Sequence, residues 1–432
     1  MNWIGLIDTT RHTRQAPPGR VVAGLSLLER AVRLCAVKDC SHAVIATTAE
    51  FAEEVEAIAA DIDFGIELLV RPVDDDAPTA VIAQTADTIA PFLDTVDGVM
   101  FVRSSTVYDR GLVHAFDGDE IPEGIAVAST ELDELADLLE TRADVWPEIA
   151  EYCAGHTHRD IAELAAVADS TTTDTDKWQV RVEDAQSADG AALRLWSGCR
   201  KDVDGIVSRH LNRYISLSIS RAIAATGIKP NHISIVTFSL GALAAIFAGI
   251  GGYWWFVLAG ITYQINSVVD GVDGELARVK YEFSLLGEWL DTLSDDNKDV
   301  LFYAGLAIGA WRTWDFPIDG FDATTWLWLG GIAVAGKLVS MVAYYTWLIA
   351  NKRGDLLAFE WSFEDDDQRE ASALSSALAN LKYLTKNDFI VFFAMVLSFL
   401  GVLPYFLFIV APGQFFIAAS VTLQRLQRRR AG

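Results

Sequence analysis

Six long apolar segments fill the second half of the chain, and they constrain its fold more than any other feature. They occupy residues 232–250, 252–270, 286–311, 324–349, 387–402 and 404–424. Several approach the ~20 consecutive apolar residues that an α-helix needs to cross a bilayer. We therefore expect a polytopic, all-α membrane domain with six transmembrane helices over residues 231–432.

The first half of the chain has a different composition. Residues 1–200 contain 37 acidic and 15 basic side chains, whereas residues 201–432 contain 22 and 19. A strongly acidic surface favours solubility and disfavours nucleic acid, whose phosphates are also negative. The four cysteines form no CxxC pair, so we expect reduced thiols. These features predict a soluble acidic domain over residues 1–195 and no nucleic-acid partner.

Short apolar runs alternate with helical patterns in this acidic half. HAVIAT and GVMFV are typical of buried strands, and GLSLLERAVRLCAV and TAVIAQTADTIAPFLDTV are typical of helices. Such alternation predicts an α/β domain with a mostly parallel sheet.

The orientation of the membrane domain follows from basic residues near the ends of the apolar segments. The C-terminal QRLQRRR is expected in the cytoplasm, and six spans then place the N-terminal domain there too. Residues 196–230 have the pattern of an amphipathic helix that lies along the interface as a linker. Trp254, Trp255, Trp326 and Trp328 suit an aromatic belt on the opposite side. We expect an integral protein of the cytoplasmic (inner) membrane.

Four aspartates stand where the second apolar segment ends and the third begins. Asp270 and Asp273 are three residues apart, and Asp291 and Asp295 are four apart, so each pair shares one face of a helix. Four carboxylates at one point repel each other unless cations neutralise them, and Mg²⁺ or Mn²⁺ prefers such all-oxygen sites. The spacing predicts a divalent-metal site on two neighbouring helices at the cytoplasmic surface.

Two glycines inside the same helical segments favour this interpretation over a solvated acidic loop. Gly274 and Gly287 each cost about 1 kcal/mol relative to alanine in a helix. Close approach of a flat ligand or of a neighbouring backbone is the usual gain that offsets such a cost. A solvated loop would need neither glycine.

The fixed residues of this stretch resemble the signature of the CDP-alcohol phosphotransferase family. The match reads Asp270-x2-Asp273-Gly274-x2-Ala277-Arg278-x8-Gly287-x3-Asp291-x3-Asp295. Members of this family are six-helix membrane enzymes that transfer the substituted phosphate of a CDP-alcohol to a second alcohol and release CMP. The resemblance covers roughly residues 200–430. It implies a CDP-alcohol donor such as CDP-diacylglycerol, a small alcohol acceptor, a lipid bilayer and a homodimer.

The resemblance also implies roles for the four acids. Asp270, Asp273 and Asp291 would ligate the Mg²⁺ or Mn²⁺ that bridges the CDP diphosphate. Asp295 would complete the metal site and act as the general base on the acceptor hydroxyl, which must lie within hydrogen-bond reach.

Further residues receive substrate-binding roles. By resemblance, Gly274, Ala277 and Gly287 would leave room for the cytidine, and Arg278 would contact phosphate or brace an aspartate. Lys337 lies near the middle of the fourth apolar segment, and a lysine inside a membrane is a functional candidate by default. Snorkelling of Lys337 towards the cytoplasmic side is the alternative.

The chain departs from many family members directly after Asp295. A basic residue is usual there, whereas this chain has Asp296. Two explanations stay open. Lys298 supplies the missing charge from one turn away, or Asp296 marks a subfamily with a different acceptor.

The order of elements in residues 1–195 resembles the sugar-phosphate nucleotidyltransferase fold. Archaeal inositol-phosphate cytidylyltransferases are fused to a CDP-alcohol phosphotransferase in this order, which makes inositol or its phosphate the first candidate acceptor. However, TTRHTRQAPPGR follows the first strand in place of a glycine-rich loop, and FVRSSTV stands where a metal-binding aspartate belongs. We expect this domain to be inactive. The alternatives are a bifunctional enzyme that also makes the CDP-alcohol, and a membrane scaffold without catalysis.

Overall fold

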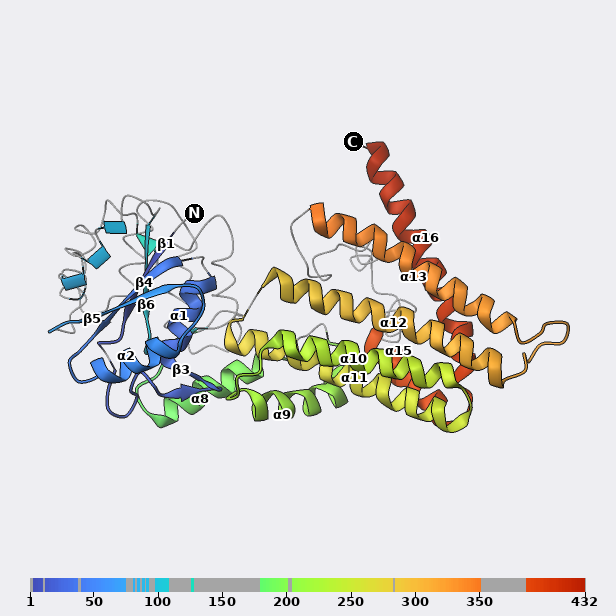
Figure 1. The fold of residues 1–432 in the computed structure, drawn as a ribbon, viewed down its shortest axis with the longest axis horizontal. Coiled ribbons are helices and arrows are strands. Elements are labelled where there is room, and N and C mark those ends of the chain that lie inside the picture. Colours follow the sequence, from blue (N-terminus) through green and yellow to red (C-terminus); the bar gives the residue numbers. More distant parts are fainter. Residues whose placement is uncertain are drawn as a thin grey trace, which may run out of the picture. The chain divides into compact units, whose positions relative to one another are not determined.

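The computed structural model describes residues 3–10, 12–37, 40–74, 98–108, 126–127, 179–200, 204–282, 284–350 and 386–431, with a few positions between 81 and 92. The chain divides into two compact units (Figure 1). The N-terminal unit comprises Met1–Cys199, Ile223–Gly227 and Ala277–Glu282. The helical unit comprises Arg200–Ala222, Ile228–Leu276 and Phe283–Gly432.

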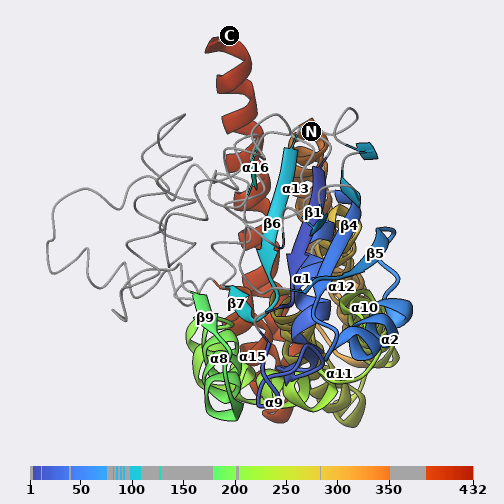
Figure 2. The same cartoon turned by 90° about the vertical axis from the view of Figure 1, so that its left-hand side faces the viewer.

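The N-terminal unit is built on a five-stranded sheet with the order β5-β4-β1-β6-β8. Its strands are β1 (Trp3–Asp8), β4 (Cys40–Thr47), β5 (Glu67–Pro72), β6 (Gly98–Arg103) and β8 (Ala126–Val127). β1 pairs in parallel with β4 and β6, β4 pairs in parallel with β5, and β8 runs antiparallel to β6. Figure 2 shows β6, β1 and β4 side by side. The prediction of an α/β region with a mostly parallel sheet is confirmed.

Helices and two small two-stranded sheets complete the described part of this unit. They are β2 (Val21–Val22) with β3 (Leu25–Ser26), β7 (Thr106–Tyr108) with β9 (Gln179–Arg181), α1 (Leu27–Val37), α2 (Ala52–Asp61) and α8 (Ala185–Ser197). The first predicted helix begins only at Leu27, because the residues before it form β3. Of the second predicted helix, residues 79–96, only some positions fall within the described residues, and these are helical.

The helical unit contains all six predicted apolar segments, each on helical backbone. Its elements are α9 (Arg213–Ile223) after the π-helix η2 (Ser208–Asn212), α10 (Pro230–Ile250), α11 (Tyr253–Lys280), α12 (Leu285–Thr313), α13 (Thr325–Ala350), α15 (Asn387–Phe399), and α16 (Leu407–Ala431) after the 3-10 helix η5 (Leu403–Phe406). α10 packs along α12, α12 packs against α13, and α13 packs against α16 (Figure 1). α12, which carries two of the four predicted metal ligands, therefore lies between two others.

Three stretches in the described residues are long and apolar enough to cross a membrane: Pro230–Ile250, Thr325–Ala350 and Leu403–Leu423. α11 and α12 are longer, but polar and charged side chains interrupt their apolar residues. α15 has only 13 residues. Length and composition thus indicate a membrane protein with three candidate spans.

Small residues let α10 and α12 approach closely. A Cβ atom at Gly305 would lie 2.3 Å from the Ala245 carbonyl oxygen, and one at Gly309 would lie 1.9 Å from that of Ala248. Both distances are impossible for real side chains, so the two glycines, four residues apart on α12, are required by the crossing. Such small residues are enriched where helices pack inside membranes.

Three of the four tryptophans expected in an aromatic belt are exposed, and the fourth is not. Trp254 and Trp328 are 74% and 73% exposed, and Trp255 is 40% exposed. Trp326 is fully buried and packs edge-on against Phe316 and Phe408, so its assignment to the belt was wrong. An indole at that position fills the core, because α13 turns this face towards the neighbouring helices.

Candidate functional site

Three of the four predicted metal ligands come together in the helical unit. Carboxylate oxygens of Asp270 on α11 and of Asp291 and Asp295 on α12 all lie within 4.8 Å of one another. We call these three residues the carboxylate cluster. The four-residue spacing on α12 aims two side chains at α11, as helical geometry requires.

The cluster fits a hard divalent cation. All of its donors are carboxylate oxygens, the type that Mg²⁺ and Mn²⁺ prefer. The Asp270 Oδ1 atom is buried and has no hydrogen-bond partner among the described residues. A buried acceptor without a partner is costly, and a bound cation would satisfy it.

Asp273, the fourth predicted ligand, is not among these three residues. It is 6% exposed and accepts a hydrogen bond of 2.8 Å from the Ser234 hydroxyl on α10. The backbone N–H of Gly274 also donates to Asp273, over 2.6 Å. Ser234 therefore orients an acid one turn along α11 from Asp270, a partner that the sequence did not reveal.

One small residue of the signature, Gly287, lies where the start of α12 approaches α10. A Cβ atom at Gly287 would lie 3.0 Å from the Ser284 hydroxyl, which caps α12, and 3.2 Å from the Asn231 amide oxygen. Gly287 thus has a packing reason within the helical unit. Ala277 and Arg278 follow Asp270 by two turns of α11, and the buried Nε of Arg278 has no hydrogen-bond partner among the described residues.

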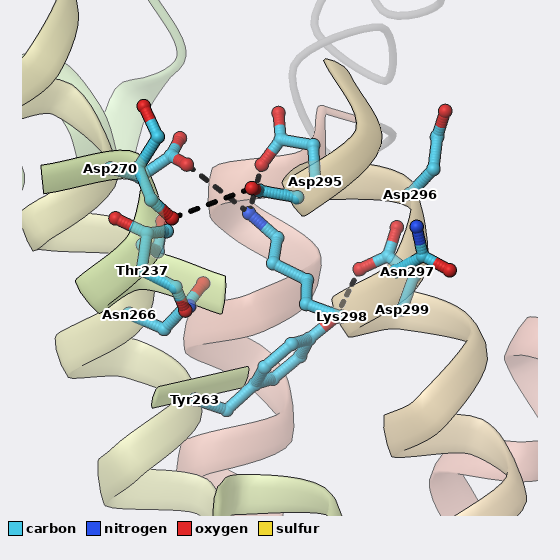
Figure 3. A network of polar contacts seen from close by, with 12 residues as sticks. Thr237, Tyr263, Asn266, Asp270, Asp295, Asp296, Asn297, Lys298 and Asp299 are labelled. Carbon is cyan, nitrogen blue, oxygen red and sulfur yellow. Dashed lines mark hydrogen bonds and ion pairs between the residues drawn. The ribbon is translucent and has the colours of Figure 1, made fainter. Parts of the chain in front are cut away.

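The amine of Lys298 lies directly beside the carboxylate cluster. This side chain is 2% exposed, and its Nζ forms an ion pair with Asp295 and lies 3.8 Å from Asp270 Oδ1. Figure 3 shows its stem running from α12 towards these two carboxylates. The charge expected one turn after Asp295 is therefore delivered to the cluster itself.

Asp296 and Asp299 lie apart from Lys298, and both pair with Lys337 of α13. The Lys337 Nζ lies 2.9 Å from Asp296 Oδ1 and 3.0 Å from Asp299 Oδ2. Both carboxylates are buried, so this cation holds α12 against α13. Lys337 belongs to this paired network and is not in contact with the carboxylate cluster.

Three tyrosines complete the network around Lys337. The hydroxyls of Tyr344 and Tyr345 both donate to Asp296 Oδ2, and that of Tyr263 donates to Asp299 (Figure 3). Asp299 follows Asp295 by four residues, so the sequence could have indicated that both lie on the same face of α12. Nothing in the sequence connects the three tyrosines with Asp296 or Asp299. Such contacts are set by how three helices pack.

A second buried network fixes α11 against α9. Glu275 follows the Asp273-Gly274 pair, is fully buried, and accepts hydrogen bonds of 2.6 Å from Ser216 and Ser220. Arg213 donates one hydrogen bond of 3.0 Å to Glu275 and two hydrogen bonds of 2.8 Å to Asp204. α9 thereby holds the helix that carries Asp270 and Asp273.

Comparison with known proteins agrees with this geometry. Residues 228–411 match the model of the CDP-alcohol phosphatidyltransferase family. The chain is 38% identical over 143 residues to a bifunctional IPC transferase and DIPP synthase of Thermococcus kodakarensis, covering 33% of this chain and 29% of the relative. It is 40% identical over 113 residues to the protein of the same name from Aquifex aeolicus, covering 26% and 25%.

A third relative is an archaetidylinositol phosphate synthase of Pyrococcus horikoshii, 32% identical over 97 residues that cover 22% of this chain and 50% of the relative. The chain thus spans less than a third of the length of the first two relatives and half of this one. The match to the family model contains the whole aspartate signature and every acid of the carboxylate cluster. Over residues 228–411 this chain therefore carries a CDP-alcohol phosphatidyltransferase domain, the family that the aspartate spacing predicted.

Proposed function

We propose that this chain transfers the substituted phosphate of a CDP-alcohol, such as CDP-diacylglycerol, to the hydroxyl of an acceptor alcohol and releases CMP. The observation that carries the proposal is the carboxylate cluster of Asp270, Asp291 and Asp295 inside a domain of this family. The names of the relatives support inositol or inositol phosphate as the acceptor.

Each acid has a distinct task in the proposed reaction. Asp270, Asp291 and Asp295 would hold Mg²⁺ or Mn²⁺, with Asp273 completing the donor set. When bound, the ion supplies charge neutralisation for the donor diphosphate. Asp295 accepts the proton of the acceptor hydroxyl, whose oxygen bonds to the phosphorus next to the substituted alcohol. The bond from that phosphorus to the oxygen of CMP breaks, and CMP leaves with the electron pair.

The signature residues around the acids would shape the donor site. The nucleotide would lie against a helix surface that carries only small side chains, at Gly274, Ala277 and Gly287. Arg278 would contact the phosphate of the donor. For Lys337 we propose a positioning role, because it is paired with Asp296 and Asp299, which follow Asp295 within four residues on α12. Its removal would disturb the rotation of α12 and, through it, Asp295.

The arrangement in the membrane belongs to the same proposal. Six spans formed by α10, α11, α12, α13, α15 and α16 would place the carboxylate cluster at the cytoplasmic surface of the inner membrane, where a soluble CDP group arrives. The apolar side chains Leu211, Tyr214 and Ile215 are exposed on or beside α9, which supports an interfacial linker at residues 196–230. A homodimer follows from the family resemblance.

The test is CMP release by the purified full-length protein from CDP-diacylglycerol and Mg²⁺ with a panel of alcohols. Asp295→Asn should lower the rate by about 10²–10⁴-fold, the usual contribution of a general base. Asp319→Asn is the matched control, since Asp319 lies in an exposed loop and its loss should leave the rate unchanged. Unchanged CMP release in the Asp295 variant would overturn the mechanism and revive a scaffold role.

A second candidate function is synthesis of the CDP-alcohol by the N-terminal unit, which is favoured by the bifunctional name that two relatives share. The contacts of His12, which follows β1, do not favour this activity. The His12 ring forms hydrogen bonds of 2.7 Å with the Ala16 carbonyl oxygen and with the hydroxyl of Ser104, which follows β6. Burial lowers the pKa of His12, so this imidazole is neutral and offers no charge to a triphosphate. We therefore propose that this unit, residues 1–195 with a nucleotidyltransferase-like fold, is inactive.

A further inference from the structure

The proposed reaction gives no role to Lys298, although its amine lies among the acids of the site. Its Nζ forms an ion pair with Asp295 and is 3.8 Å from Asp270 Oδ1. These are two of the three residues whose oxygens gather within 4.8 Å of one another. A positive charge is therefore built into the place where a divalent ion would bind.

The fold holds this lysine in position. Its side chain is 2% exposed, and a Cβ atom at Gly241 of α10 would lie 2.6 Å from the Lys298 Cβ. Only glycine at position 241 leaves room for the stem at this crossing. A buried ammonium is costly unless carboxylates surround it, and here two do so.

We infer that Lys298 is a built-in monovalent cation of the carboxylate cluster, which competes with a divalent ion for Asp270 and Asp295. The inference rests on the proposed function only in treating the cluster as a metal site. While no divalent ion is bound, Lys298 offsets the repulsion among the carboxylates. When a divalent ion arrives, it meets a positive charge already in contact with two of its ligands, and like charges at such short range weaken binding.

A purely structural tie makes the opposite prediction. If Lys298 only holds α12 against α11, its loss would let the carboxylates move apart, and a divalent ion would bind more weakly. If Lys298 competes, its loss removes a repelling charge, and the ion binds more tightly. The sign of the change in metal affinity therefore decides between the two roles.

The experiment is titration of purified full-length protein with Mn²⁺ at one fixed pH, with free Mn²⁺ read by electron paramagnetic resonance and with no donor or acceptor present. Lys298→Met keeps the length of the side chain and removes its charge. Its affinity for Mn²⁺ should rise at least tenfold, which corresponds to about 1.4 kcal/mol. Arg312→Met is the matched control, because Arg312 is an exposed cation in the last turn of the same helix, α12, and follows Lys298 by fourteen residues. Its affinity should change by less than about threefold, because its charge acts from a greater distance.

Thermal unfolding supplies a second measurement. In a chelator, Lys298→Met should unfold at a lower temperature than the wild type, and Mn²⁺ should raise its unfolding temperature by more. If the methionine variant does not fold in chelator, it is purified in Mn²⁺, together with a second variant, Lys298→Gln. The rate at which each variant loses Mn²⁺ to an added chelator is then measured. Both variants should lose the ion more slowly than the wild type does.

Each outcome has a defined meaning. Unchanged or weaker Mn²⁺ binding in the Lys298 variants overturns the competition, and an equal gain in Arg312→Met shows that contact with the cluster is not the cause. Tighter binding without CMP release from any CDP-alcohol upholds this inference and refutes the proposed function. A wild-type protein that binds no Mn²⁺ under any of these conditions refutes both.

Discussion

Replacing Arg213 with methionine should destabilise the helical unit and slow the proposed reaction together. The guanidinium of Arg213 grips Asp204 through two hydrogen bonds of 2.8 Å and reaches Glu275 over 3.0 Å. Glu275 is fully buried, and the Asp204 side chain is only 9% exposed. Removing one partner of a buried ion pair costs about 3–5 kcal/mol, because a charge that was paired must now be buried without its counter-ion.

The lower end of this range applies here. Glu275 keeps its two hydrogen bonds from Ser216 and Ser220, and these continue to stabilise the carboxylate. We therefore expect a loss of about 3 kcal/mol in unfolding free energy. Because Glu275 directly follows Asp273 and Gly274 on α11, the same change should also lower the rate of CMP release.

Unfolding of the detergent-solubilised protein in a denaturant series, followed by tryptophan fluorescence, measures the first effect. Arg209→Met is the matched control, since Arg209 is an exposed arginine one turn earlier, and surface substitutions usually stay within about 0.5 kcal/mol. Adding Glu275→Gln to the Arg213 variant removes the buried charge and should recover part of the lost stability. A loss below about 1 kcal/mol in the single variant, or no recovery in the double variant, would refute this account of the network.

Two further predictions concern the helix crossing and the N-terminal unit. Gly309→Ala should lower the free energy of unfolding by about 1–3 kcal/mol through overpacking, since its Cβ would lie 1.9 Å from the Ala248 carbonyl oxygen. Gly331→Ala is the control and should be neutral or slightly stabilising, because there is open space around Gly331. Equal unfolding transitions in the two variants would contradict the close crossing of α10 and α12. The full-length protein should release no pyrophosphate from CTP and inositol phosphate with Mg²⁺, and any such release above that of a boiled sample would establish the bifunctional alternative.

The sequence predicted the parts of the site that depend on short-range spacing. Asp291 and Asp295 share a face of α12 because they are four residues apart, and Asp270 meets them because α11 and α12 are neighbours in the chain. The helices themselves were predictable because apolar runs of this length have few other structures available to them. The mostly parallel sheet followed from the alternation of strand and helix patterns.

The sequence could not predict which contacts the polar side chains make across helices. A substrate-binding role for Lys337 stays a prediction, but its pairing with Asp296 and Asp299 could not be foreseen, because it depends on α13 lying on their side of α12. Ser234 and Tyr263 find their acidic partners through packing, and neither shows any pattern in the chain. The sequence around Trp326 did not distinguish it from the exposed Trp328, but the rotation of α13 about its axis buries Trp326.

Asp296, which stands where the family resemblance led us to expect a basic residue, has a physical consequence. An acid buried on α12 needs a positive partner, and Lys337 of α13 supplies it at 2.9 Å. The positive charge that the family resemblance led us to expect directly after Asp295 is supplied here by Lys298, one turn on and in contact with the cluster. Since each lysine is held by two acids, α12 is fixed in rotation between α11 and α13. That rotation determines where the oxygens of Asp291 and Asp295 point, so Asp296 and the two lysines together position the proposed base.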